Sequence, residues 1–191
     1  YETMRNMAER YDGYGFGIKK VMEQQAVTSG IIGAVADIIK VEEKYETAIE
    51  TALGGSIQNI VTDTQKTAKK MIEYLKKNRY GRVTFLPLGA VKGKEFARKE
   101  ILLEPGVIGA ANQLVIYDEV YKDLFASLLG QILVVKDMDV GIKIANKYHH
   151  SVRIVTLDGD SLNRGGAMSG GAFKNKSNLL GRSREVEELK K

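Results

Sequence analysis

An internal twofold repeat constrains the fold of this chain more than any other feature. Residues 45–54 (YETAIETALG) and 121–130 (YKDLFASLLG) share a tyrosine, a helical run of apolar residues and a closing glycine. Two further matches join residues 60–63 (IVTD) with 134–137 (VVKD), and residues 82–86 (RVTFL) with 153–157 (RIVTL). Each half then has the order strand–helix–strand–helix–strand, which predicts two related α/β subdomains. Chance similarity between two α/β units is the alternative.

The spacing of apolar residues and the positions of glycine and proline indicate where the elements lie. Helices are expected at residues 41–55, 64–79, 120–129 and 140–147, and strands at residues 30–40, 57–63, 82–88, 114–117, 132–136 and 153–157. Thr64 is expected to cap its helix, and the Gly54–Gly55 pair to end the helix before it. Loop-forming residues gather over 89–113, where we place the boundary between subdomains.

Both ends of the sequence have the pattern of interrupted helices. Met4, Met7 and Tyr11 are spaced by three and then four residues, and Val186 and Leu189 lie three apart in a charged stretch. This pattern predicts the stubs of coiled-coil helices, with ordinary frayed terminal helices as an equal alternative. The predicted fold class is α+β, with two pseudo-symmetric mixed α/β subdomains between such stubs. The predicted divisions are 1–11 (incoming helix), 12–100 (subdomain I), 101–175 (subdomain II) and 176–191 (outgoing helix).

Composition narrows the class of protein. The 191 residues are 43% hydrophobic, enough for a globular core, and 29 basic against 24 acidic residues give a net charge of +5. A mildly basic chain is compatible with nucleic-acid binding without requiring it. With no cysteine and two histidines, a disulfide framework or a Cys- or His-rich metal site is not expected. No apolar run is long enough to span a membrane and no signal peptide is evident, so a cytoplasmic location is expected.

Four glycines fall within seven residues, at Gly165, Gly166, Gly170 and Gly171. A phosphate-binding loop would need Lys followed by Ser or Thr directly after the second glycine of the motif, and neither is there. Glycines beside a strand also permit close approach of another backbone, so the segment is a candidate dimer contact. A flexible loop leading to the exit helix is an equal alternative, and a phosphate- or nucleotide-binding α/β domain remains the competing function.

The sequence contains no convincing catalytic constellation. Asp158 and Asp160 flank a glycine, which is more typical of a turn than of a Mg²⁺ site. The His149–His150 pair lies at a predicted helix end, where a solvated terminus is favoured over a metal site. No nucleophile has a recognisable base partner, so we expect no enzyme activity, no metal and no cofactor.

Basic residues form three clusters. The lysines of helix 64–79 have the pattern of a solvated face. The other two clusters are candidates for phosphate contacts with DNA, and the DNA-binding candidates are Lys92, Lys94, Lys174, Lys176, Arg182 and Arg184. Few aromatic residues lie among them, so base stacking is not expected.

Several stretches together resemble the hinge domain of prokaryotic structural maintenance of chromosomes (SMC) proteins. The matching stretches are residues 33–39 (GAVADII), 44–55 (KYETAIETALGG), 58–61 (QNIV), 81–88 (GRVTFLPL), 153–159 (RIVTLDG) and 165–171 (GGAMSGG). They cover most of the chain between the end helices. One departure is Arg164, where the family often has proline before its glycine pair.

The resemblance implies a function in chromosome condensation and segregation. Hinges of this family join two arms of a long antiparallel coiled coil and form homodimers through two edge-to-edge sheet contacts. The family's final glycine run, here Gly165, Gly166, Gly170 and Gly171, lies at that interface. The resemblance also implies non-sequence-specific DNA binding, a nucleoid-associated cytoplasmic location, and an ATPase in a distant head domain. Accessory subunits are expected to bind elsewhere on the full-length protein.

Overall fold

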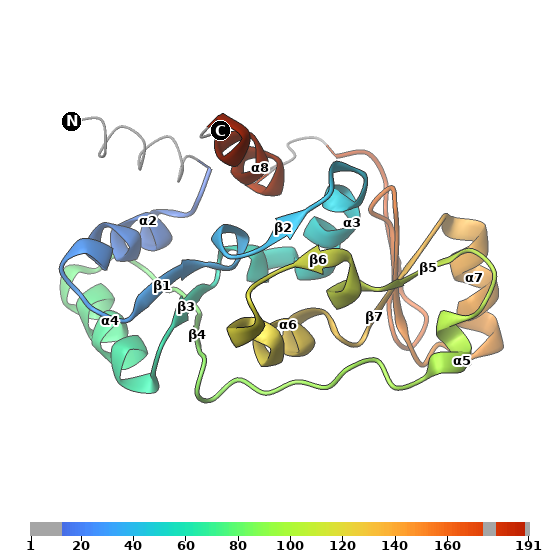
Figure 1. Ribbon diagram of the computed structural model, residues 1–191, viewed down its shortest axis with the longest axis horizontal. Coiled ribbons are helices and arrows are strands. Elements are labelled where there is room, and N and C mark those ends of the chain that lie inside the picture. The colour runs from blue at the N-terminus through green and yellow to red at the C-terminus, as the bar shows by residue number, and fades with distance from the viewer. Residues whose placement is uncertain (1–12, 174–178, 190–191) are drawn as a thin grey trace. The chain divides into compact units, whose positions relative to one another are not determined.

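The computed structural model describes residues 13–173 and 179–189 (Figure 1). These residues divide into two compact units, the first formed by 13–39, 55–91 and 179–189 and the second by 40–54 and 92–173. The grouping differs from the predicted division at residues 100 and 101, because residues 40–54 belong with the second unit and the chain changes unit between 91 and 92.

The first unit is a small sheet with helices packed on it. Its elements are α2 (Phe16–Glu23), β1 (Ile31–Ala34), β3 (Ile60–Thr62), α4 (Gln65–Asn78), β4 (Phe85–Pro87) and α8 (Leu179–Leu189). The strand order is β1-β3-β4, with β1 antiparallel and β4 parallel to β3. Helix α4 packs against β3 and β4 because Ala68, Met71 and Leu75 form its buried face.

The second unit is built on a five-stranded sheet in the order β10-β9-β8-β7-β5. Its strands are β2 (Lys40–Val41), β5 (Val107–Ala110), β6 (Val115–Ile116), β7 (Ile132–Val135), β8 (Arg153–Thr156), β9 (Ser161–Leu162) and β10 (Met168–Ser169). Its helices are α3 (Glu43–Leu53), α5 (Lys99–Leu102), α6 (Lys122–Leu129) and α7 (Met138–Lys147). A core of buried side chains, including Ile101, Leu133 and Ile154, packs on the sheet beneath α7.

Two contacts explain why residues 40–54 join the second unit. Strand β2 forms an antiparallel pair with β6, aligning Val41 with Val115. At the end of α3, the guanidinium of Arg153 donates hydrogen bonds to the carbonyls of Ala52 and Thr51, at 3.1 and 3.2 Å. Neither contact is signalled by local sequence, because the partners are far apart along the chain.

The same local structure occurs in both units. Strand β1 pairs with β3, and β5 pairs with β7, each antiparallel with one register irregularity. At these irregularities Gly33 and Gly109 have φ of 151° and 157°, conformations that L side chains rarely adopt. A short 3₁₀ turn follows each strand, Val35–Asp37 in the first unit and Ala111–Leu114 in the second. Two units of one design, as predicted from the repeat, are therefore present.

The predicted alignment of the repeats is wrong in register. By their strand pairings, Ile60 and Leu133 occupy equivalent positions in the two units. This is one residue away from the predicted match of 60–63 with 134–137. Phe85 and Ile154 are likewise equivalent, which is two residues away from the predicted match of 82–86 with 153–157. Short runs of β-branched residues resemble one another in several registers, whereas backbone hydrogen bonding selects one.

Other expectations need smaller corrections. The strand predicted over 30–40 is two strands, β1 and β2, separated by the 3₁₀ turn, in which the Asp37 carboxylate accepts from the N–H of Ala34 at 3.1 Å. Strand β5 lies in the region predicted to be loop, because its flanking glycines and proline have the composition of a turn. The helix capped by Thr64 is confirmed as α4, and the helices near 41–55, 120–129 and 140–147 are confirmed as α3, α6 and α7.

The predicted end helices are only partly within the described residues. Residues 1–11 lie outside them, and the outgoing helix, predicted from residue 176, is described as α8 from Leu179 to Leu189. Leu179 and Leu180 are buried, and α8 packs against the 3₁₀ turn Val35–Asp37 of the same unit. In the parts of the chain that the structure describes, no helix has the length and apolar character needed to cross a membrane.

A candidate interface at the glycine-rich sheet edge

The glycine-rich segment forms the outermost hairpin of the second unit's sheet. Strand β10 pairs with β9, aligning Met168 with Leu162 and Ser169 with Ser161. In the turn between them, Gly165 and Gly166 have φ of 85° and 105°, which favours glycine over residues with a Cβ. The Gly165 N–H donates to the His150 carbonyl at 3.0 Å, and the Gly166 N–H donates to the Asn163 carbonyl at 3.1 Å. These two glycines therefore shape the turn.

The other two glycines lie beyond β10, beside Asp160. A Cβ on Gly170 would overlap the Asp160 carboxylate, and Gly171 has a φ of 130°. The Gly171 N–H donates to Asp160 Oδ1 at 3.4 Å. From sequence, Asp160 was expected only as part of a turn, with a metal site as the alternative. Its carboxylate instead holds the chain directly after β10 against the β8–β9 connection.

Strand β10 has one side without a strand neighbour in the described residues. The Asn163 N–H bonds to the Ala167 carbonyl at 2.8 Å, and hydrogen-bonded pairs alternate along an antiparallel ladder. The Met168–Leu162 pair is then non-hydrogen-bonded, so the N–H and C=O of Met168 point away from β9. Met168 and Phe173 are each 54% exposed. The edge thus combines unpaired backbone groups with apolar side chains.

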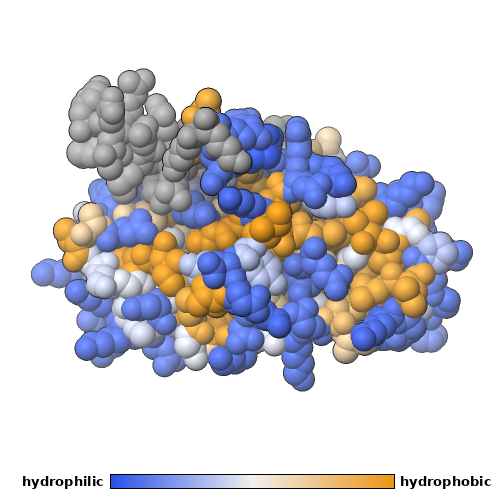
Figure 2. Space-filling view, viewed as in Figure 1, coloured by the Kyte–Doolittle hydropathy of each residue, from blue (hydrophilic) through white to orange (hydrophobic). Residues whose placement is uncertain are grey.

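Strand β4 is a second open edge, in the first unit. Val83, Phe85, Leu86 and Leu88 are half-buried along it, and a groove of about 380 Å³ between β4 and α4 is lined by Ala68, Ile72, Phe85 and Pro87 among others. The opposite edge strand of the same sheet, β1, is covered differently, because the Gln25 amide donates to the carbonyls of Ile31 and Ile32. Figure 2 shows apolar residues, in orange, interrupting the polar surface on the face drawn.

The candidate DNA-binding residues are divided between the two units and the residues that the structure does not describe. Lys174 and Lys176 lie outside the described residues. Arg182 and Arg184 are on α8 in the first unit, where Arg184 pairs with Glu188 at 3.3 Å. Lys92 and Lys94 are exposed in the second unit, and Lys92 pairs with Asp123 at 3.5 Å.

The loop that carries Lys92 and Lys94 is fixed by its backbone. A Cβ on Gly93 would overlap the backbone of Ser127 in α6, so this glycine permits close packing of loop and helix. The Gln131 amide donates to the carbonyls of Lys94 and Glu95, at 3.0 and 3.1 Å. The two lysine side chains are therefore displayed from a loop that is fixed to α6.

The remaining sequence candidates have structural explanations. The Asp158–Asp160 stretch is the turn between β8 and β9, where the Gly159 N–H donates to the Thr156 carbonyl at 3.0 Å. His149 and His150 lie in the turn after α7, with φ of 58° and 56°, and both are exposed. Among the described residues, no three His, Cys, Asp or Glu side chains lie together in a way that suits a metal ion. The glycine segment is a hairpin rather than a strand-to-helix loop, so the phosphate-loop alternative is not favoured.

Arg153 and the Glu104 cluster were missed from the sequence. Burial lowers the pKa of Arg153, and its guanidinium caps the carbonyls at the end of α3. Glu104 accepts hydrogen bonds from Lys147 and Tyr148, which lower the pKa of its carboxyl group. Both arrangements stabilise the second unit, and the only sequence signal for either was an arginine at the start of a buried strand.

Two mixed α/β units of one design, each with an open sheet edge, define a class of interaction domain in which sheet edges are available for pairing. Comparison with known proteins identifies the family. The sequence pattern of the family described as "SMC proteins Flexible Hinge Domain" matches residues 28–145. The chain belongs to the SMC hinge domain family.

Relatives and solved structures agree with this assignment. The chain is 42% identical over 196 residues to the chromosome partition protein Smc of Desulfitobacterium hafniense and 41% identical over 194 residues to that of Bacillus subtilis. All of this chain is covered in both comparisons, but it spans only 16% of each relative's length.

Among solved structures, an asymmetric dimer of the Geobacillus stearothermophilus SMC hinge domain matches with a TM-score of 0.89 and 42% identity. That match covers 99% of this chain and 77% of the other. The Pyrococcus furiosus SMC hinge domain matches with a TM-score of 0.71 and 30% identity, covering 91% of each chain.

Proposed function

We propose that this chain is a homodimerisation domain and that β10 is one of its contact edges. The observation that carries the proposal is the open side of β10, with an outward-facing backbone at Met168 and exposed Met168 and Phe173 side chains. An unpaired edge of this kind is satisfied when another strand adds to the sheet. The solved relative from Geobacillus stearothermophilus is described as a dimer, which supports the same assembly here.

Strand β4 of the second copy is the partner edge that we propose for β10. A closed two-fold pair uses the same surfaces twice, and two separate contacts per pair require two different edges on each chain. Of the first unit's two edges, β1 is covered by Gln25, whereas β4 carries half-buried apolar side chains beside a groove. Met168 and Phe173 of one copy would bury their exposed surface on β4 of the other.

The proposal extends to the longer protein. Because the curated relatives are chromosome partition proteins in which this region is 16% of the length, we propose that the domain couples two coiled-coil arms. The ATPase and the sites for accessory subunits would lie elsewhere in that protein, in the cytoplasm at the nucleoid. Accessory, non-sequence-specific DNA contact by Lys92, Lys94, Lys174, Lys176, Arg182 and Arg184 is part of the same proposal.

Solution mass by light scattering tests the dimer, with lysine substitutions as the perturbation. Met168→Lys places a charge on the β10 edge, a device that blocks strand addition in natural proteins. Leu103→Lys is the matched control, because Leu103 is an apolar residue that is 84% exposed and lies outside every strand. We expect a dimer for the native chain and for Leu103→Lys, and a monomer with native circular dichroism for Met168→Lys. A native chain that stays monomeric at high concentration would overturn the proposal.

The DNA contact is tested separately. We expect the double variant Lys92→Ala, Lys94→Ala to bind a single-stranded oligonucleotide more weakly and with a shallower dependence on salt. With fewer phosphate contacts, binding releases fewer counterions from the oligonucleotide. Equal affinity for the native chain and this variant would remove these two lysines from the proposed contact.

A further inference from the structure

A small groove in the second unit brings together two arginines that neither the fold nor the dimer explains. It has a volume of about 150 Å³, and it is lined by Arg98, Gln131, Ser151 and Arg164 together with the apolar residues Phe96, Ala97 and Val152. We call it the arginine groove. It lies beside the β9–β10 turn, because Arg164 is in that turn and the neighbouring Gly165 N–H bonds to the His150 carbonyl.

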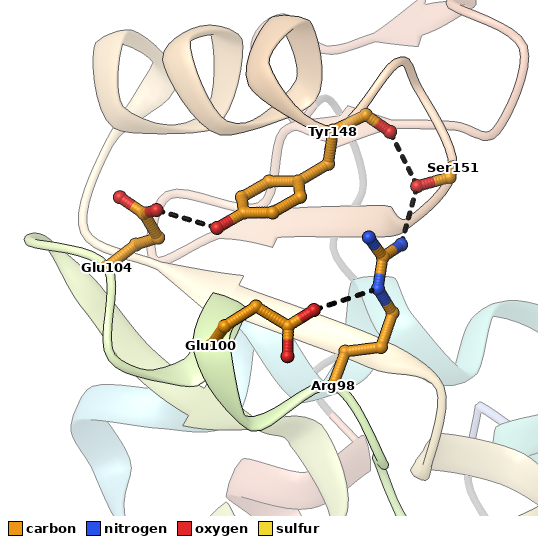
Figure 3. Close-up of polar contacts among 5 residues, drawn as sticks. All are labelled: Arg98, Glu100, Glu104, Tyr148 and Ser151. Atoms are coloured by element: carbon orange, nitrogen blue, oxygen red, sulfur yellow. Dashed lines mark hydrogen bonds and ion pairs between the residues drawn. The ribbon is translucent and has the colours of Figure 1, made fainter.

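The first arginine is held in place by its neighbours. Figure 3 shows the Arg98 guanidinium between Glu100 and Ser151, below the ring of Tyr148. Nη1 donates to Ser151 Oγ at 2.8 Å, Nε pairs with Glu100 at 3.4 Å, and the guanidinium carbon lies 5.3 Å from the centre of the Tyr148 ring. A guanidinium has five N–H donors in a fixed fork, so donors remain for a ligand after these contacts.

The second arginine has no such neighbours. Within the described residues the Arg164 side chain makes no hydrogen bond or ion pair, and it is exposed at the groove. The groove's neutral polar side chains are already engaged. Ser151 Oγ donates to the Tyr148 carbonyl at 2.6 Å, and the Gln131 amide nitrogen donates to the carbonyls of Lys94 and Glu95. The donors left for a ligand are therefore mainly guanidinium groups.

The balance of charge favours an anion. Among the described residues, two guanidinium groups line the groove and no carboxylate does, and Glu100, which contacts Arg98, is paired with that arginine. The next acidic residue along the chain, Glu104, is engaged by Lys147 and Tyr148. A volume of 150 Å³ is below the roughly 300 Å³ of pockets that enclose whole drug-sized ligands. It suits a single phosphate group, which arginine recognises through paired N–H donors.

We propose that the arginine groove binds a phosphate group between Arg98 and Arg164. The groove's small size admits either free phosphate or one phosphodiester of a strand running across it. If the bound group is a phosphodiester, the groove is a further site of the proposed DNA contact. The assignment to a phosphodiester rather than to free phosphate rests on the proposed function. Bound phosphate would also tie the β9–β10 turn to the loop before α5.

Arg164→Ala is the variant that tests the groove, because this side chain makes no hydrogen bond or ion pair with the described residues that its loss would disturb. Lys66→Ala is the matched control, since Lys66 is an exposed cation on α4 in the other unit. Each protein is titrated against a fluorescent single-stranded oligonucleotide at several salt concentrations, and against inorganic phosphate followed by ³¹P line width. Solution mass is measured on the same samples.

We expect Arg164→Ala to weaken oligonucleotide binding roughly 10- to 150-fold, as loss of a charge-assisted hydrogen bond predicts. We also expect the slope of log affinity against log salt to become shallower by about 0.7. Arg164→Lys should recover part of the affinity because it keeps the charge without the fork. If Arg164→Ala affects only the ³¹P broadening, the groove stands and its ligand is free phosphate.

The groove is refuted if Arg164→Ala matches Lys66→Ala with both probes. That result is distinct from failure of the proposed function. A weakened Lys92→Ala, Lys94→Ala variant beside an unaffected Arg164→Ala would leave the DNA contact standing without the groove. A monomeric native chain would remove the dimer without bearing on phosphate binding.

Discussion

Replacing Met168 by proline should separate backbone pairing at the β10 edge from side-chain burial. The Met168 N–H points away from β9, so its loss leaves the β9–β10 ladder intact, and edge strands tolerate proline at such positions. Met168→Ala keeps the N–H and removes only the side chain. The comparison of the two variants therefore isolates the effect of the outward N–H and of the space that the proline ring occupies.

The magnitudes follow from exposure and from hydrogen-bond energetics. Full burial of a Met side chain contributes about 1.5–3 kcal/mol, and Met168 has 54% of its surface left to bury. Met168→Ala should then cost about 0.8–1.6 kcal/mol per contact, or roughly 10- to 200-fold in dimer Kd for two contacts. Proline removes a further hydrogen bond of about 0.5–1.5 kcal/mol per contact, another 5- to 150-fold or so.

Sedimentation equilibrium measures both dissociation constants, and urea denaturation of the monomers checks that each variant is folded. We expect the dimer Kd to rise in the order native, Met168→Ala, Met168→Pro, with similar unfolding free energies for the two variants. A folded Met168→Pro that dimerises as tightly as Met168→Ala would show that β10 does not pair through its outward backbone.

Three further predictions concern the partner edge, the glycines and the acid response. The chain has no cysteine, so a mixture of Met168→Cys and Phe85→Cys chains should cross-link with a bismaleimide more than either chain alone. Strong cross-linking of Met168→Cys alone would instead indicate that β10 pairs with β10. Gly170→Ala should lower the unfolding free energy by about 1–3 kcal/mol, because its Cβ overlaps the Asp160 carboxylate. Adding Asp160→Ala should recover part of that loss in urea denaturation, and strict additivity would contradict the contact. Hydrogen bonds from Lys147 and Tyr148 hold the pKa of Glu104 below its usual 4.5, so its contribution is complete above that pH and is lost as the pH falls through the lowered pKa. Glu104→Gln should therefore flatten the fall of Tm between about pH 5 and pH 2, and an unchanged acid limb would count against the cluster.

Helices were the elements that sequence predicted best. The face of α4 formed by Ala68, Met71 and Leu75 has a clear helical period, and Thr64 caps it by accepting from the Thr67 N–H. Such signals are local, because capping and periodicity depend on residues within one or two turns. The family resemblance, which the comparisons confirm, also rested on several local stretches read together.

Strand boundaries and the division into units were harder to predict. Strand β5 lies in a region predicted to be loop, because glycines such as Gly106 and Gly109 are typical of turns. In the structure Gly106 directly precedes the strand and Gly109 lies at its register irregularity. Residues 40–54 lie with the second unit, whereas the predicted division placed them in subdomain I, because their partners, β6 and Arg153, are distant in sequence. Pairing partners of this kind leave no trace in the local composition.

The glycine segment was a candidate interface from sequence and stays a prediction, but the separate roles of its glycines were not predicted. The prediction from sequence was a single surface without side chains, formed by Gly165, Gly166, Gly170 and Gly171. In the structure Gly165 and Gly166 set a turn through positive φ, while Gly170 leaves room for Asp160. Asp160 itself was considered only as a turn or metal residue, because its role depends on a neighbour eleven positions away.

The length of β10 limits what backbone pairing alone can contribute to a dimer. The strand has two residues, and alternation leaves only Met168 with both backbone groups facing outward. A few hydrogen bonds of about 1 kcal/mol each fall well short of the roughly 12 kcal/mol that a nanomolar dimer requires. Most of the stabilisation must then come from apolar surface, which Met168 and Phe173 offer on one edge and the groove beside β4 offers on the other. In this scheme backbone pairing sets the register of the two chains, and side-chain burial sets the affinity. Ile72 is 38% exposed beside the β4 groove, so Ile72→Ser should weaken the dimer by about 0.6–1.1 kcal/mol per contact, which is comparable with loss of the outward N–H of Met168.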